Sequence, residues 1–154
     1  MKKHILVVED DEVYLSAISA ILSHEGFRVS EASDGESALK MLTENSETAD
    51  LLITDIRMPG MNGITLIKAV REYGIRIPAI AVSGDVDRKT AEKLFEIGCG
   101  DYLEKPFTRA ELLSKISMVM GNQAQERNQL KMDTGFVPLK MQEFRQRAAL
   151  QNSI

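Results

Sequence analysis

Apolar residues along the first 120 positions fall into short continuous runs separated by longer amphipathic stretches. A continuous apolar run of four to eight residues is typical of a strand buried on both faces, and alternation of apolar and polar residues is typical of a half-buried strand. On this basis five strands are expected, at residues 5–8, 27–32, 51–54, 78–82 and 102–103.

The stretches between these runs have apolar residues at helical spacing. Asp34 is expected to cap one helix, and Thr108 with Glu111 forms a capping-box pattern before another. Five helices are therefore expected, at residues 13–22, 34–42, 64–73, 87–97 and 109–119, three of them followed by Gly26, Gly74 or Gly98.

Strict alternation of apolar strands and helices predicts a parallel sheet covered by helices on both faces. We expect an α/β fold, a doubly wound three-layer sandwich, in which ligands bind at the carboxyl ends of the strands. Residues 1–120 are predicted to form this domain. Residues 121–154 are too few for a second domain and are predicted to form a C-terminal tail, with an amphipathic helix near residues 141–150.

Composition narrows the class of protein. The net charge is −4, with the acidic excess in residues 1–120 and a small basic excess in the tail, which argues against direct nucleic-acid binding. No apolar run is long enough to cross a bilayer, so membrane insertion is not expected. Cys99 is the single cysteine and permits no intrachain disulfide. Together these features predict a cytoplasmic protein.

Acidic residues stand where two of the predicted strands end. Glu9 and Asp10 follow the first apolar run, and Asp55 follows the third. If these strands are parallel neighbours, the three carboxylates converge, and their repulsion calls for a cation. Oxygen ligands without His or Cys favour Mg²⁺. The alternative for Glu9 and its neighbours is a plain helix N-terminus, where carboxylates are also favoured.

Two further residues favour the metal site over the plain helix N-terminus. Ser83 follows the fourth predicted strand and Lys105 follows the fifth, so both belong at the same edge of the sheet. A hydroxyl and an ammonium group facing a metal-bound carboxylate are what an acyl phosphate needs.

These pieces together resemble the receiver domain of two-component response regulators, over roughly residues 3–120. The resemblance rests on four motifs in the right order: ILVVED at residues 5–10, DIRMPGMNG at 55–63, AVSG at 81–84 and GCGDYLEKPF at 98–107. It implies a flavodoxin-like five-stranded sheet with strand order 2-1-3-4-5.

The resemblance also implies roles for single residues. Glu9 and Asp10 match the acidic pair that holds Mg²⁺, with Asp10 the expected direct ligand. Asp55 matches the aspartate that accepts the phosphoryl group, and the backbone carbonyl of Arg57 completes the metal site. Lys105 matches the lysine that pairs with the phosphate, and the bond before Pro106 is expected to be cis.

Two positions match the family's switch residues. Ser83 corresponds to the hydroxyl that bonds a phosphoryl oxygen, and Tyr102 to the aromatic residue whose inward or outward position reports the switch. Departures are few: Gly84 and Cys99 stand where alanine is usual, and Asp85 is a candidate to alter hydrolysis of the phosphoaspartate.

The implied function is that of a phosphorylation switch in a phosphorelay, not of an enzyme acting on a separate substrate. The donor would be a histidine kinase or a histidine phosphotransfer protein. A downstream protein would bind the face from Asp87 to Val119 or the tail, and a homodimer is compatible with the same resemblance.

Three rival interpretations share parts of this pattern. A phosphohydrolase with an aspartate nucleophile would have a second Asp where this chain has Arg57. A nucleotide-binding domain would have a glycine-rich turn in place of Glu9 and the acidic residues after it. The third is a pseudo-receiver, an interaction module that works without phosphorylation. Because all the motif residues are present in this chain, it ranks below a working switch and is kept as the alternative.

Overall fold

The computed structural model describes residues 2–44 and 49–130, the last nine of these as backbone only. Five strands alternate with five helices. The strands are β1 (His4–Val8), β2 (Arg28–Ala32), β3 (Leu51–Asp55), β4 (Ala79–Ser83) and β5 (Asp101–Glu104). The helices are α1 (Glu12–His24), α2 (Gly35–Glu44), α3 (Gly63–Glu72), α4 (Arg88–Glu96) and α5 (Arg109–Leu130).

All strand pairs in the sheet are parallel, and the strand order is β2-β1-β3-β4-β5. The predicted doubly wound sheet with order 2-1-3-4-5 is therefore confirmed. The order reverses direction at β1, with β2 on one side and β3 on the other. In a sheet of this kind the carboxyl ends of β1 and β3 form the edge where ligands bind.

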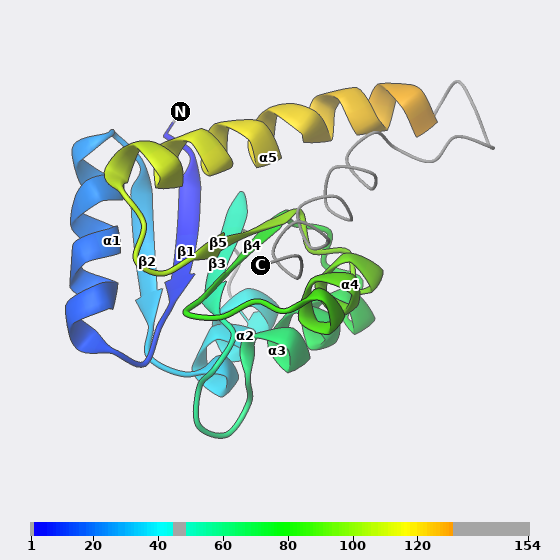
Figure 1. Ribbon diagram of the computed structural model, residues 1–154. Coiled ribbons are helices and arrows are strands. Elements are labelled where there is room, and N and C mark those ends of the chain that lie inside the picture. Colours follow the sequence, from blue (N-terminus) through cyan, green and yellow to red (C-terminus); the bar gives the residue numbers. More distant parts are fainter. Residues whose placement is uncertain (1, 45–48, 131–154) are drawn as a thin grey trace.

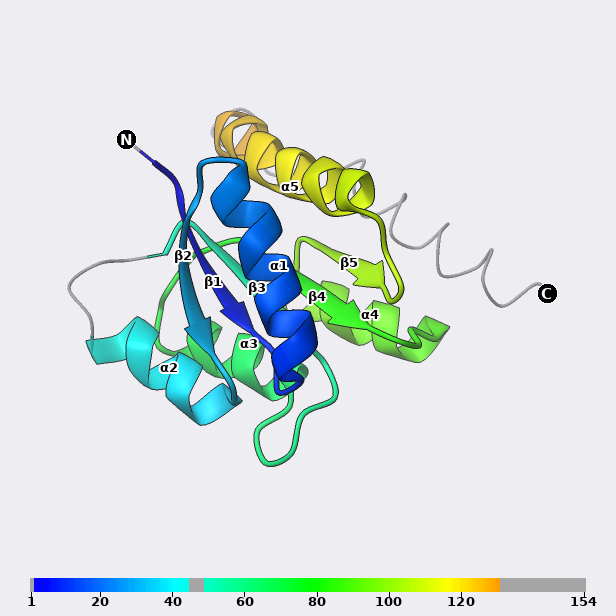
Figure 2. The same ribbon diagram turned by 90° about the vertical axis from the view of Figure 1, so that its left-hand side faces the viewer.

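The helices cover the sheet in two layers. Helices α1 and α5 lie on one face, and α2, α3 and α4 lie on the other (Figure 1). Successive residues of a strand point to opposite faces, so Leu6 and Val8 of β1 join the core under α2–α4, while Ile5 and Val7 join the core under α1 and α5. Figure 2 shows α1 crossing in front of the sheet.

Most helix limits follow from local capping. The carboxylate of Asp34 accepts a hydrogen bond from the backbone of Ser37 at 2.7 Å, and Thr108 Oγ1 accepts one from Glu111 N at 3.1 Å, as predicted. The glycines expected after three of the helices have positive φ, a conformation that glycine adopts without steric cost: Gly26, Gly74 and Gly98.

The last helix differs from its prediction. Apolar spacing predicted a helix at residues 109–119, but α5 continues to Leu130. Residues 122–129 have no apolar stripe from which a helix could be recognised, yet Gln, Glu, Arg and Ala among them have good intrinsic helix propensity. The predicted domain limit at residue 120 stays a prediction, and the helix expected near residues 141–150 lies outside the described residues.

Candidate functional site

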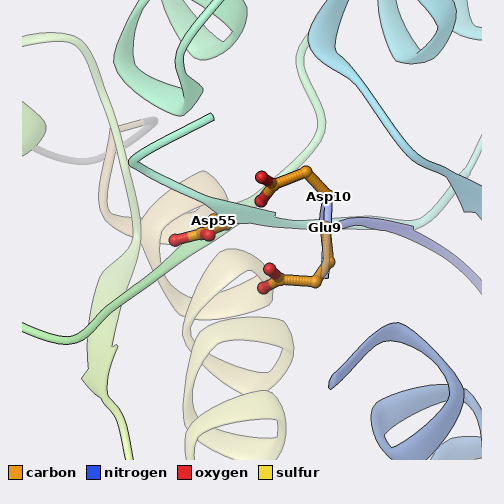
Figure 3. A group of neighbouring side chains, drawn as sticks. All are labelled: Glu9, Asp10 and Asp55. Atoms are coloured by element: carbon orange, nitrogen blue, oxygen red, sulfur yellow. The ribbon is translucent and has the colours of Figure 1, made fainter. Parts of the chain in front are cut away.

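Three carboxylates meet at the carboxyl ends of β1 and β3. Asp55 is the last residue of β3, and Glu9 and Asp10 follow directly on β1. Val8 is paired with Thr54 across the two strands, so the residues that follow them, Glu9 and Asp55, lie at the same level of the sheet. One oxygen from each carboxylate lies within 4.8 Å of the others. Figure 3 shows Glu9 and Asp10 with their carboxylates turned toward Asp55.

Burial makes it unfavourable for these neighbouring carboxylates to be charged at the same time. Glu9 is 2% exposed and Asp55 is 7% exposed, whereas Asp10 is exposed to solvent. Burial, followed by the nearby negative charge of Asp55, raises the pKa of Glu9 above its ordinary value, although a hydrogen bond from Lys105 opposes the rise. A cation at this position would relieve the repulsion among the carboxylates.

The three acidic residues after β1 have separate environments. Asp11 is the N-cap of α1, and its Oδ1 accepts from Val13 N at 2.9 Å. Glu9 accepts from Asp11 N through Oε1 at 3.2 Å and from Lys105 Nζ through Oε2 at 2.8 Å. The helix N-terminus proposed as the alternative for all three therefore accounts for Asp11 alone. Both oxygens of Glu9 are engaged, which leaves the exposed Asp10 as the more open ligand.

Lys105 is placed between two of the carboxylates. Its ammonium nitrogen is 2.8 Å from Glu9 Oε2 and 3.4 Å from Asp55 Oδ2, although it comes from the loop after β5. Burial lowers the pKa of Lys105, but the two carboxylates outweigh this effect and the net shift is upward. The ammonium therefore stays charged over the ordinary pH range. The peptide bond from Lys105 to Pro106 is cis, as predicted.

Ser83 ends β4 at the same edge and is 1% exposed. Its hydroxyl donates to the carbonyl oxygen of Asp85 at 3.2 Å and accepts from the backbone N–H of Asp85 at 3.4 Å. The hydroxyl is thus turned to the loop that follows β4. Asp85 is fixed next to Ser83 through its backbone.

The remaining predicted residues lie around this group. Arg57 is exposed in the loop that follows β3. Tyr102, in β5, is 4% exposed and belongs to the core under α2–α4, so its ring is in the inward position. Lys115 Nζ lies 6.0 Å from the centre of that ring and 2.9 Å from Asp101 Oδ2.

The sequence did not identify two residues that shape the loop after β3. Gly63 begins α3 against the backbone of Asp55, and its N–H donates to Ile56 O at 2.9 Å. Glu36, in the first turn of α2, accepts from the backbone N–H of Met61 at 3.2 Å. Gly63 is the last residue of the DIRMPGMNG motif, and this position could have indicated its role. No sequence pattern links Glu36 to Met61.

Comparison with known proteins identifies the family. The profile of the response regulator receiver domain matches residues 5–117, which is most of the chain. This chain belongs to the response-regulator receiver family. Its place in the family agrees with the five-stranded parallel sheet and with the acidic group at the ends of β1 and β3.

Two curated relatives of this receiver are transcriptional regulators. The transcriptional regulatory protein CpxR of Escherichia coli is 35% identical over 140 residues, covering 89% of this chain and 57% of that protein. The alkaline phosphatase synthesis transcriptional regulatory protein PhoP of Bacillus subtilis is 31% identical over 120 residues, covering 78% of this chain and 49% of its own length. The chain thus spans about half the length of these relatives.

Solved receiver structures match the fold over nearly their whole length. A CheY-like receiver domain protein from Methanospirillum hungatei aligns with a TM-score of 0.75 and 28% identity, over 82% of this chain and 99% of its own. A receiver domain protein from Clostridium thermocellum aligns with a TM-score of 0.70 and 29% identity, over 84% and 99%. In the part of the chain that the structure describes, no helix is both long and apolar enough to span a membrane.

Proposed function

We propose that this receiver is a phosphorylation switch of a two-component phosphorelay and that Asp55 accepts the phosphoryl group. The observation that carries the proposal is the meeting of Glu9, Asp10, Asp55 and Lys105 at one edge of the sheet. A carboxylate nucleophile, an oxygen ligand set for a metal and a lysine cation are the parts that phosphoryl transfer requires. Membership of the receiver family supports the same assignment.

The acidic group fits a magnesium ion. Its donors are all carboxylate oxygens, they lie within 4.8 Å of one another, and the exposed Asp10 leaves room for water ligands. Asp10 and Asp55 would hold the ion through their side chains and Arg57 through its backbone carbonyl, with Glu9 in support. When bound, Mg²⁺ offsets the carboxylate charge and stabilises negative charge on the phosphoryl oxygens.

The transfer itself uses a carboxylate oxygen of Asp55. This oxygen attacks phosphorus in line and forms an acyl phosphate, while the bond from phosphorus to the donor atom breaks and its electron pair leaves with the donor. With a phosphohistidine donor, the imidazole nitrogen leaves and takes a proton from solvent. Lys105, 3.4 Å from Asp55 Oδ2, supplies a fixed positive charge beside the transferred group.

Phosphorylation would then change the contacts of Ser83. The phosphoryl group adds up to about −2 of charge at the end of β3. Ser83 would exchange its bonds to the backbone of Asp85 for a bond to a phosphoryl oxygen, moving the loop after β4. The ring of Tyr102 is already inward in this structure. The movement of the loop would favour that position over the outward one, so phosphorylation would bias an equilibrium between two states.

The partners follow from this switch. A histidine kinase or histidine phosphotransfer protein would supply the phosphoryl group, and a downstream protein would bind the face from Asp87 to Val119 or the tail. We propose no direct nucleic-acid contact for this acidic domain. The protein would act as a phosphoacceptor that assists its own phosphorylation and dephosphorylation, and its cytoplasmic location stays a prediction.

The test is phosphorylation by acetyl phosphate, followed by intact mass, with and without Mg²⁺. We expect a labile adduct on the wild type in Mg²⁺ and none on Asp55→Asn. A known receiver labelled in parallel controls the conditions. If the wild type stayed unlabelled while that control was labelled, the pseudo-receiver alternative would replace this proposal.

A further inference from the structure

The ammonium group of Lys105 lies over the ring of Tyr14, with Nζ 4.2 Å from the ring centre. Tyr14 belongs to the first turn of α1, whereas Lys105 follows β5, so two distant parts of the chain make this contact. At such a distance the face of an aromatic ring attracts a cation, more strongly where water is partly excluded. Both side chains are partly buried.

The ring of Tyr14 is itself held in place. Its backbone N–H donates to Asp11 Oδ1 at 3.3 Å, which ties the residue to the N-cap of α1. The ring of Phe107 packs beside it, with centres 6.0 Å apart and planes tilted by 57°. Both rings pack against the core under α1 and α5. The ring face that Lys105 meets is therefore a fixed surface.

The ammonium thus has three neighbours: the carboxylates of Glu9 and Asp55 and the ring of Tyr14. A lysine side chain is a flexible four-carbon stem with a compact charge, and two carboxylates alone leave it free to swing toward water. The ring closes part of that path. Its loss would let the ammonium spend more time away from Asp55.

We propose that Tyr14 is a positioning residue for Lys105, whose ring confines the ammonium group beside Asp55 and thereby speeds phosphoryl transfer. The inference rests on the proposed transfer to Asp55 and deepens it, since the family motifs assign a role to Lys105 and none to Tyr14. Only the ring face is used, so the Tyr14 hydroxyl is dispensable. Tyr14→Phe keeps the face, and Tyr14→Leu removes it while leaving an apolar side chain against Phe107.

The contact is tested first by NMR, without Mg²⁺ or phosphodonor. Protons over the face of an aromatic ring resonate upfield, so we expect upfield-shifted ε-methylene protons for Lys105 in the wild type and in Tyr14→Phe. In Tyr14→Leu these resonances should return to the ordinary lysine position. Unshifted resonances in the wild type would overturn the inference whatever the phosphorylation result.

The second test is the rate of labelling by acetyl phosphate in Mg²⁺, measured by intact mass far below the unfolding temperature of each variant. We expect Tyr14→Leu to be labelled about threefold to tenfold more slowly and Tyr14→Phe at nearly the wild-type rate. Tyr73→Leu is the matched control, because Tyr73 is 66% exposed at the end of α3. Its labelling rate should equal that of the wild type.

A double-mutant comparison separates positioning from a general effect on the fold. If Tyr14 acts through Lys105, then Tyr14→Leu causes no further slowing in a Lys105→Met background. The same slowing in that background, or a wild-type rate for Tyr14→Leu alone, overturns the role of Tyr14 and leaves the proposed function standing. A wild type that takes no phosphoryl group overturns the proposed function, and this role with it.

Discussion

The α-carbon of Gly63 lies against the backbone carbonyl of Asp55: a β-carbon added at position 63 would be 2.1 Å from the Asp55 oxygen. Real β-carbons essentially never approach within 3.0 Å of such an atom. The turn after β3 can therefore close only around a glycine. The first residue of α3 thus helps to fix the backbone that presents the proposed phosphoacceptor.

We expect Gly63→Ala to lower the free energy of unfolding by about 3 kcal/mol, because the methyl group can be accommodated only if the backbone shifts. Urea denaturation followed by circular dichroism measures this. Gly84→Ala is the control, since a β-carbon at Gly84 would meet nothing within 4 Å. Equal stability of the two variants would refute the close approach.

Adding Mg²⁺ should stabilise the wild type, because at the proposed site the ion would bind the folded carboxylate group and offset its repulsion. At a concentration of ten times the dissociation constant the gain is about 1.4 kcal/mol. Asp10→Asn should lose this gain and, in EDTA, should be at least as stable as the wild type, since one carboxylate charge is gone. Thermal unfolding with and without the ion checks both statements, and an Asp10→Asn variant that kept the full gain would contradict the ligand assignment.

Removing Glu36 should weaken Mg²⁺ binding although Glu36 is not a ligand. It accepts from Met61 N at 3.2 Å and so holds the loop between β3 and α3, which carries Arg57. A single hydrogen bond of this kind predicts a dissociation constant about twofold to fivefold higher for Glu36→Ala by calorimetry. Glu36→Gln keeps an acceptor oxygen and should restore the affinity. Weakening in both variants would instead point to the lost charge.

Burial raises the pKa of Cys99 from 9.0 to about 12, so the thiol is expected to resist alkylation. At pH 8.5, iodoacetamide should label the folded protein far more slowly than the protein in urea, as judged by mass. The native state retains the thiol proton of Cys99 to a higher pH than the unfolded state does. The contribution of this thiol to the free energy of unfolding is therefore fully present below pH 9 and is lost between pH 9 and 12. Cys99→Ala is the comparison and should lose less stability over that interval.

Much of the fold was predictable because each element is encoded locally. The buried strand β3 is an apolar run that ends in Thr54 and Asp55, and β4 is one that ends in Ser83. Asp34 and Thr108 cap the helices that follow them, as such residues commonly do. The meeting of Glu9 and Asp55 followed as well, because parallel strands end at one edge.

Other parts of the site depend on contacts between distant residues that no periodicity encodes. The ring of Tyr14 under Lys105 and the bond from Met61 to Glu36 arise only when α1, β5, α2 and the loop after β3 come together. The sequence also could not show that Asp11 caps α1 while the carboxylate of Asp10 stays open, because the two residues are of the same type and adjacent in the chain.

The length of α5 has a mechanical consequence. Its 22 residues form a rod of about 33 Å that begins three positions after Pro106, beside the lysine loop, and runs on past the last strand (Figure 1). A tilt of about 5° at the first turn would sweep the far end through about 3 Å. A small displacement of the first turn would therefore give a larger displacement at the far end of the helix, where a neighbouring molecule could respond to it.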